Sequence, residues 1–251
     1  MVGELIVNGM VISSSPIGET DKRVVLLTKE EGKISAFARG ARRMNSPLIA
    51  ATMPFTYGVF SIYRGRDSAG IKSADIRGHF SEITDDIDAL WYGSYFLEVA
   101  EYFALEGADE TDRLNLLYVT LHALSKKQLS PQLIRWVYEL RSWAVNGEYP
   151  NVFSCVSCGR EDELTFFSMS GGGSLCADCG SLSTESEKIS QSAHFAMQYI
   201  ITAPFKKLYS FNLKKEVEDE LISFLKRWRN RYFTHKYKSE EFLTYAKMEE
   251  I

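Results

Sequence analysis

The chain has 251 residues, 45% of them hydrophobic, and a formal net charge of −4. This length allows one large or two ordinary domains, and two is the better prediction. No apolar run reaches the roughly 18 residues of a membrane span, and residues 1–10 lack the basic-then-apolar layout of a signal peptide. We therefore expect a cytoplasmic protein with no membrane association, in which paired cysteines are more often metal ligands than disulfides.

The acidic net charge hides an uneven distribution along the chain. Residues 1–79 contain 11 Lys and Arg against 7 Asp and Glu, a net charge of +4, so the remainder carries −8. Such asymmetry indicates an anion-binding module at the N-terminus.

Five short strands separated by turn signals are predicted in the first 80 residues. They cover Glu4–Ile12, Arg23–Thr28, Lys33–Arg39, Phe55–Tyr63 and Gly70–Phe80. The third alternates clearly, with Ile34, Ala36 and Ala38 on one face. Five strands in a unit this small predict a partly closed β-barrel of the OB or SH3-like kind.

From about residue 84 the hydrophobic period becomes helical, which places a domain boundary between Phe80 and Thr84. Thr84 is the predicted N-cap of the first helix, and a second helix starts near Thr111. The third has Ser130 as N-cap and Pro131 as first residue, and it ends at Gly147 and Pro150.

Two further helices are predicted near the C-terminus. One is Phe195–Thr202, and the other is long, with a core-facing stripe formed by Val217, Leu221, Phe224, Trp228 and Tyr232. The fold class is therefore α+β and multidomain: a barrel at 1–80 and a helical domain at 81–251, with an insertion at about 151–184.

All four cysteines of the chain lie in this insertion. They form two C-x2-C pairs separated by 17 residues: Cys155, Cys158, Cys176 and Cys179. Each pair can turn two thiolates onto one cation, and Gly159 and Gly180 follow the pairs where the chain must bend. The spacing predicts one structural, tetrahedral Zn²⁺ per chain. Disulfides or free buried thiols are the alternative interpretation.

Catalytic groups are hard to assemble from this sequence. The four histidines lie in unrelated contexts, and neither a nucleophile motif nor a phosphate-cradling loop is present. Four thiolate ligands also leave a zinc ion no open position for a water nucleophile. We expect a binding protein rather than an enzyme.

Cations beside an exposed aromatic residue mark the best candidate binding surface. Phosphates bind cations and bases stack on rings, so this combination is typical of single-stranded nucleic-acid sites. The predicted nucleic-acid contacts are Lys33, Phe37, Arg39, Arg42, Arg43, Arg64 and Arg66. An ordinary solvated sheet face is the alternative interpretation. A second basic segment, Lys226–Lys238, is interpreted as a solvated helix end, with a phosphate contact as the alternative.

Short motifs along the chain carry a family resemblance. They are Glu19-Thr20-Asp21, Val25-Leu26-Leu27-Thr28, Glu31-Gly32-Lys33, Gly40-Ala41-Arg42-Arg43, Pro54-Phe55, Arg135-Trp136-x-x-x-Leu140, Gly147-x-Tyr149-Pro150, Cys155-x-x-Cys158-Gly159, Gly172-Gly173-x-Leu175-Cys176-x-x-Cys179, Lys206-Lys207-Leu208-Tyr209-Ser210-Phe211 and Lys238-Ser239-x-x-Phe242-Leu243. In combination they resemble the bacterial RecO family of DNA-repair proteins along nearly the whole chain. Two departures are Trp136, where Phe is more usual, and the presence of all four cysteines, which some relatives lack.

The resemblance implies an OB-fold followed by a helical domain, without catalytic turnover. It also implies binding to single- and double-stranded DNA, annealing of complementary strands, and cooperation with RecR to load RecA onto strands coated by single-strand-binding protein (SSB). Arg42 and Arg43 carry over as DNA contacts, and Arg135 as part of the pocket for the SSB C-terminal tail. The expected location is the cytoplasm, in association with the nucleoid.

Two other function classes stay open. A zinc-ribbon transcription or RNA-binding factor would show a sequence or RNA preference, whereas a recombination mediator would anneal unrelated complementary sequences. A zinc-dependent hydrolase is the more distant alternative, because it requires an open metal position.

Overall fold

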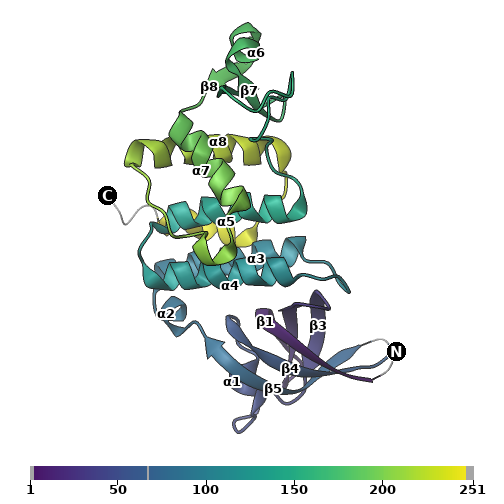
Figure 1. Cartoon of the computed structure of the whole chain (residues 1–251). Helices are drawn as coiled ribbons and strands as arrows, with labels where there is room; N and C mark the ends of the chain where they lie inside the picture. Colours follow the sequence, from purple (N-terminus) through teal and green to yellow (C-terminus); the bar gives the residue numbers. More distant parts are fainter. Residues whose placement is uncertain (1–2, 67, 247–251) are drawn as a thin grey trace. The chain divides into compact units, whose positions relative to one another are not determined.

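The computed structural model describes residues 3–66 and 68–246 (Figure 1). Tertiary contacts divide the chain into two compact units. The first contains the described residues up to Lys127 together with those from Tyr237 onward, and the second is Gln128–Lys236. The first unit combines five strands with helices, and the second is mainly helical, so the fold is α+β as predicted.

The five predicted strands are all present. They are β1 (Gly3–Ile17), β2 (Asp21–Thr28), β3 (Lys33–Ala38), β4 (Thr56–Arg64) and β5 (Ala69–His79). They close into a barrel in the order β1-β2-β3-β5-β4, and only the β3–β5 pair is parallel. β1 continues beyond its predicted end at Ile12, because its second half pairs with β2 as far as Ile17 opposite Asp21.

Alternating side chains fill the barrel and leave an outer face. Ile34, Ala36 and Ala38 of β3 point into the barrel core, as their alternation predicts. Val25 and Leu27 of β2 lie outside this core but are also buried, because helices of the same unit cover that part of the barrel. The outer surface is therefore open to solvent only where these helices do not reach.

The helices of the first unit come from three places in the sequence: between β3 and β4, directly after β5, and after the second unit. They are α1 (Leu48–Ala51), α2 (Ser81–Thr84), α3 (Ile87–Phe103), α4 (Thr111–Lys126), the 3-10 helix η2 (Lys238–Glu241) and α9 (Phe242–Ala246). The prediction that Thr84 caps the long helix is wrong, because Thr84 ends α2. Asp86 caps α3 instead, and its carboxylate accepts a hydrogen bond from the N–H of Ala89 at 3.0 Å.

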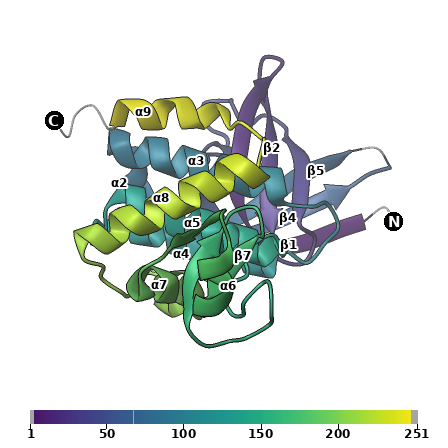
Figure 2. The ribbon, with the colours of Figure 1, turned by 90° about the horizontal axis from the view of Figure 1, so that it is seen from above.

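The C-terminal segment returns to the first unit and lies along α3 (Figure 2). Glu98 of α3 holds it in place, since its carboxylate accepts hydrogen bonds from the N–H groups of Lys238 at 2.9 Å and Ser239 at 2.8 Å. Tyr237 packs edge-on against Tyr95, with ring centroids 5.4 Å apart. Residues 237–246 are therefore part of the first unit although they follow the second in sequence.

The second unit contains three longer helices and a small sheet. Its elements are α5 (Pro131–Asn146), β6 (Leu164–Ser168), β7 (Gly173–Cys176), α6 (Ala177–Leu182), β8 (Ser186–Lys188), α7 (Gln191–Thr202), the 3-10 helix η1 (Phe205–Lys207) and α8 (Lys215–Tyr232). Figure 1 shows β7, α6 and β8 projecting from the end of this unit beyond α7 and α8. The predicted insertion thus corresponds to the small sheet, which continues slightly past residue 184.

Local end signals fix α5 as predicted. The Ser130 hydroxyl caps its first turn, and Gly147 ends it in the left-handed region with φ 77°, where glycine has no steric penalty. The predicted stripe of α8 is only partly correct. Phe224 and Trp228 are buried, whereas Tyr232 is 43% exposed and donates its hydroxyl hydrogen to the carbonyl of Met169.

Among the helices in the described part of the chain, none combines the length and apolar composition needed to cross a bilayer.

Candidate zinc centre and nucleic-acid interface

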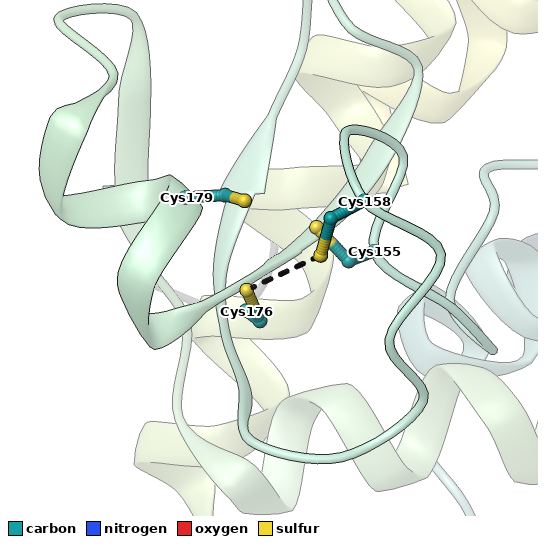
Figure 3. Close-up of side chains that lie close together, drawn as sticks. All are labelled: Cys155, Cys158, Cys176 and Cys179. Atoms are coloured by element: carbon teal, nitrogen blue, oxygen red, sulfur yellow. Dashed lines mark hydrogen bonds between the residues drawn. The ribbon is translucent and has the colours of Figure 1, made fainter.

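The four cysteine side chains converge on one point of the insertion (Figure 3). Cys155 and Cys158 lie on the loop before β6, Cys176 ends β7, and Cys179 lies in α6. Their sulfur atoms are all within 4.8 Å of one another, and the Sγ atoms of Cys158 and Cys176 are 3.8 Å apart. A tetrahedron with Zn–S bonds of about 2.3 Å has sulfur–sulfur edges of about 3.8 Å. The geometry therefore fits a metal ion held by four thiolates.

The two predicted bends differ in their physical cause. Gly159 has φ 80°, and its N–H donates to the carbonyl of Cys155 at 2.9 Å, which closes the first knuckle. Gly180 instead lies within α6, where a Cβ atom would come within 2.3 Å of the Phe166 ring. The first glycine is required by backbone conformation and the second by close packing.

The thiol pKa values fit a site for a cation. Burial raises the pKa of Cys155. Hydrogen bonds from backbone N–H groups, that of Cys176 first, have a larger opposite effect, so the pKa falls to about 6. At Cys179 a hydrogen bond with Ser157 lowers the pKa, but the adjacent Cys176 and Cys158 thiols raise it to about 12. One thiolate forms readily and suppresses another, so a divalent cation is the group that lets all four ionise.

All four cysteines are free thiols in the structure, which fits metal ligands rather than two disulfides. The buried cluster around them contains only Cys155, Leu164, Leu175 and Cys176. A core this small contributes little hydrophobic free energy, and a metal cross-link is the usual way to stabilise such a module.

Hydrogen bonds that the turn after β3 donates to residues 18–21, where β1 connects to β2, fix the conformation of that turn. Gly40, at φ 66°, donates its N–H to the carboxylate of Asp21 at 2.7 Å. Arg42 donates its N–H to the carbonyl of Thr20 at 2.8 Å and its guanidinium to the carbonyl of Gly18 at 3.1 Å. The Gly40 N–H and then the Thr20 hydroxyl hold the pKa of Asp21 below its usual range, so this carboxylate stays ionised. Two of the sequence motifs therefore meet to position Arg42.

Phe37 is exposed on the outer face of β3, and the structure separates the six cations among the predicted DNA contacts into two groups. Arg39, Arg42 and Arg43 are exposed on and around this turn. The others, Lys33, Arg64 and Arg66, line a hollow of about 460 Å³ together with Ser35, Ala69 and their neighbours.

Two cations of the second group have partners within the protein. The ammonium of Lys33 donates to the carbonyl of Glu101 in α3 at 2.9 Å, and Arg64 pairs with Glu31 at 3.0 Å. Arg66 is exposed. All three cations of the turn are therefore exposed, whereas two of the three cations of the hollow are engaged with Glu101 and Glu31.

Sequence reasoning missed two residues on the same outer surface. Arg23 of β2 is exposed, lies opposite Phe37 in the strand register, and donates to the hydroxyl of Ser35 at 2.9 Å. Tyr63 of β4 is 53% exposed. The alternation of Tyr63 with the buried Ile62 was the signal that could have identified it.

Arg135 lies inside the second unit with an internal partner. It is 8% exposed and forms an ion pair with Glu139 of the same helix at 2.8 Å. Glu139 also pairs with Arg229 of α8 at 3.2 Å, and the Arg135 guanidinium stacks over the Trp136 ring. The predicted contact of Arg135 with the SSB tail stays a prediction, and this buried network is the setting in which it must be tested.

Two family models cover almost the whole chain. Recombination protein O N terminal matches residues 1–80, and Recombination protein O C terminal matches residues 84–241. The chain belongs to the RecO family. The resemblance drawn from the sequence motifs is therefore confirmed, and RecO membership supports a function in DNA repair and recombination.

Individual RecO relatives match along most of their length. DNA repair protein RecO of Acetivibrio thermocellus is 32% identical over 237 residues, which cover 94% of each chain. The protein of the same description from Alkaliphilus metalliredigens is 31% identical over 221 residues, 88% of this chain and 90% of the relative. That of a Thermoanaerobacter species is 27% identical over 235 residues, 93% of this chain and 94% of the relative.

Proposed function

We propose that this RecO-family protein is a non-enzymatic recombination mediator. It binds single- and double-stranded DNA, anneals complementary strands and, with RecR, helps to load RecA onto SSB-coated single strands at the nucleoid. The observation that carries the proposal is the family match along the chain, combined with a barrel that exposes Arg39, Arg42 and Arg43 on one turn.

The barrel supports an OB-fold assignment. Its closed order β1-β2-β3-β5-β4 places β1 between β2 and β4, with β3 and β5 paired in parallel. Five strands in a small Greek-key barrel are the OB architecture, which often binds single strands across its face. The four-thiolate site is proposed to hold one structural Zn²⁺, which supplies folding free energy to the insertion and leaves no open position for catalysis.

Charge neutralisation explains how such a surface promotes annealing. Two complementary strands repel each other through their phosphates, and a protein that neutralises phosphates releases condensed counterions and lowers that repulsion. Arg42 is held by Gly18 and Thr20, so it presents its charge at a fixed place on the turn. Phosphate contacts carry no base information, so the activity should be independent of sequence.

A strand-annealing assay with and without SSB tests the proposal. The protein should accelerate pairing of several unrelated complementary sequences, and it should do so on SSB-coated strands as well as on naked ones. A marked preference for one sequence, or for RNA, would instead favour a zinc-ribbon transcription or RNA-binding factor. Failure to accelerate annealing of any sequence would contradict the mediator proposal.

A further inference from the structure

One outward row of the barrel carries two exposed aromatic rings on either side of a glycine. In the strand register Phe37 of β3 lies opposite Gly70 of β5, and Gly70 lies opposite Tyr63 of β4. Residues in direct register project from the same face of a sheet. Phe37 is 38% exposed and Tyr63 is 53% exposed, so both rings face solvent from this row.

Gly70 is not required by the fold at this position. Its φ lies outside the left-handed region, and an added Cβ would meet only the carbonyl oxygen of Phe37, at an ordinary 3.7 Å. Gly58 contrasts with it, because a Cβ there would lie 2.3 Å from the carbonyl oxygen of Asp75. A strand glycine weakens a sheet and often marks a place where a ligand approaches the backbone closely. Gly70, which has no side chain, is a position of this kind, and the open space above it is called the clearance below.

The separation of Phe37 and Tyr63 is too large for the two rings to pair with each other and leaves room for a ligand between them. Paired aromatic rings have centroids about 4.5–7 Å apart, whereas Phe37 and Tyr63 stand on strands two spacings apart, about 9.6 Å. The floor between them is glycine, so flat groups can enter without meeting a side chain.

Cations lie near this row, together with Glu4, which lies opposite Tyr63 in the strand register and whose carboxylate is paired with Lys72 at 2.9 Å. Arg23 lies opposite Phe37, and Arg64 follows Tyr63 in sequence and lines the adjacent hollow with Arg66. Flat rings flanked by cations suit a polymer with π-faces and a phosphate backbone. Paired bases in a duplex expose only their edges in the grooves, whereas unpaired bases expose their faces.

We propose that Phe37 and Tyr63 form a stacking site for successive bases of an unpaired DNA strand, with Gly70 as the clearance that admits them. This proposal rests on the proposed DNA-binding function of the barrel and adds to it a base-contacting site that prefers unpaired strands. Tyr63 is the new binding residue, and its ring, not its hydroxyl, makes the contact.

The test measures binding of an unstructured oligothymidine and of an abasic strand of equal length. Tyr63→Leu keeps an apolar side chain but loses the ring, and Gly70→Val fills the clearance. Each should weaken oligothymidine binding about 5- to 150-fold, the range expected for losing one base stack. The salt dependence should not change, because no phosphate contact is lost. The abasic strand and a duplex should bind each variant as they bind the parent protein.

Matched controls separate stacking from misfolding. Tyr63→Phe retains the ring and should bind oligothymidine like the parent. Gly78→Val changes a glycine of the same strand that has no atom within 4 Å of its Cβ position, about 26 Å away along β5, and should leave binding unchanged. Gly70→Val should not lower the melting temperature, because its Cβ position is open. Parent-like oligothymidine binding by Tyr63→Leu, or an equal loss on the abasic strand, overturns the proposal.

Failure of the stacking site differs from failure of the proposed function. If Arg42→Ala with Arg43→Ala weakens binding while Tyr63→Leu and Gly70→Val do not, the barrel binds DNA through phosphates alone and only the stacking site is wrong. If the parent protein fails to bind oligothymidine, both are wrong.

Discussion

Arg42 is a cation whose backbone and side chain are both held in place, by Thr20 and Gly18. A guanidinium positioned in this way loses little side-chain entropy when it meets a phosphate. For single strands the slope of log affinity against log salt is about −0.7 per contacted phosphate, so Arg42→Ala with Arg43→Ala should make it shallower by roughly 1.4. Titration of an unstructured oligonucleotide at several salt concentrations measures this.

The control for that experiment removes the same charge from another exposed place. Lys226→Ala with Arg231→Ala changes two exposed cations of α8 in the second unit. This variant should keep the parent slope. If the salt slope becomes shallower in the Lys226 and Arg231 variant but not in the Arg42 and Arg43 variant, the DNA surface lies on the C-terminal basic segment.

Arg135 is tested against the SSB tail, with its buried partner taken into account. Arg135→Ala should weaken binding of an acidic SSB-tail peptide while sparing naked DNA. The same change removes the partner of Glu139 on α5 and leaves Glu139 paired with Arg229 alone. A loss of stability is therefore also expected. Glu139→Gln disturbs the same network without removing the guanidinium, and it should retain peptide binding. Equal peptide affinity of Arg135→Ala and the parent protein would exclude Arg135 from the site.

His194 links α7 to the cysteine-bearing sheet and gives the second unit a pH dependence. It is 7% exposed, and a ring nitrogen lies 3.0 Å from the hydroxyl of Ser174. Burial lowers the pKa of His194, an effect that outweighs the hydrogen bond with the Val152 backbone, which raises it. The folded protein therefore binds a proton less readily than the unfolded chain, so stability is present above about pH 6.5 and falls as the pH drops below it.

Urea unfolding at pH 5.5 and 7.5 measures this effect. The parent protein should lose more stability at the lower pH than His194→Gln, which keeps an amide near Ser174 but does not titrate. The comparison cancels the titration of every other group, including the thiols. Equal pH dependence in the two proteins would exclude His194 as the source.

At the residue scale, the sequence predicts faces better than partners. Alternation correctly placed Phe37 on the outer side of β3, and Arg39, which directly follows the strand, is exposed. It could not show that the ammonium of Lys33 reaches the carbonyl of Glu101, because that contact joins residues 68 positions apart. The pairing of Arg135 with Glu139 was visible as an i, i+4 spacing, but the burial of the pair depends on tertiary packing.

At the element scale, the cysteine insertion should depend on its metal. Atomic emission analysis of protein purified without added zinc should find one zinc per chain. Cys176→Ser should lose it and raise amide exchange within residues 151–184, because the cluster has few buried apolar side chains of its own. Exchange in the barrel strands should not change. Ser181→Ala, an exposed change in α6, is the control.

Other results would contradict the zinc prediction. Two disulfides, or a folded protein with no metal and four titratable thiols, would each show that the cluster is not a metal site. Loss of amide protection in the barrel of Cys176→Ser would show that the insertion is not an independent element.

Elements with local end signals were predictable, and those built by distant pairing were less so. Ser130, Pro131 and Gly147 delimit α5 through contacts within a few residues. Near residue 84 several capping residues compete, and the short helix α2 shifted the true cap to Asp86. The strands β6, β7 and β8 are only 3 to 5 residues long and pair across the insertion, so no local periodicity indicates them.

At the scale of the whole molecule, the change of hydrophobic period marks where strands end but not where compact units end. The barrel strands finish at His79, close to the predicted boundary, and the family models also divide between residues 80 and 84. The contacts nevertheless group α2, α3 and α4 with the barrel. Helices that cover the outer face of β2 belong to the compact unit whose apolar surface they bury. The hydrophobic period of a helix does not show which surface the helix packs against.

The return of the C-terminal segment to the first unit has a consequence for synthesis on the ribosome. The second unit is continuous in sequence, whereas the first is complete only when residues 237–246 emerge. Until then the side of α3 that packs against Tyr237 remains open to solvent, and the Glu98 carboxylate lacks the N–H groups that it later binds. Nascent chains expose such surfaces to chaperones and proteases. A nonsense mutation at codon 237 would leave this side of α3 exposed in the finished chain, although every proposed DNA contact and zinc ligand would still be present.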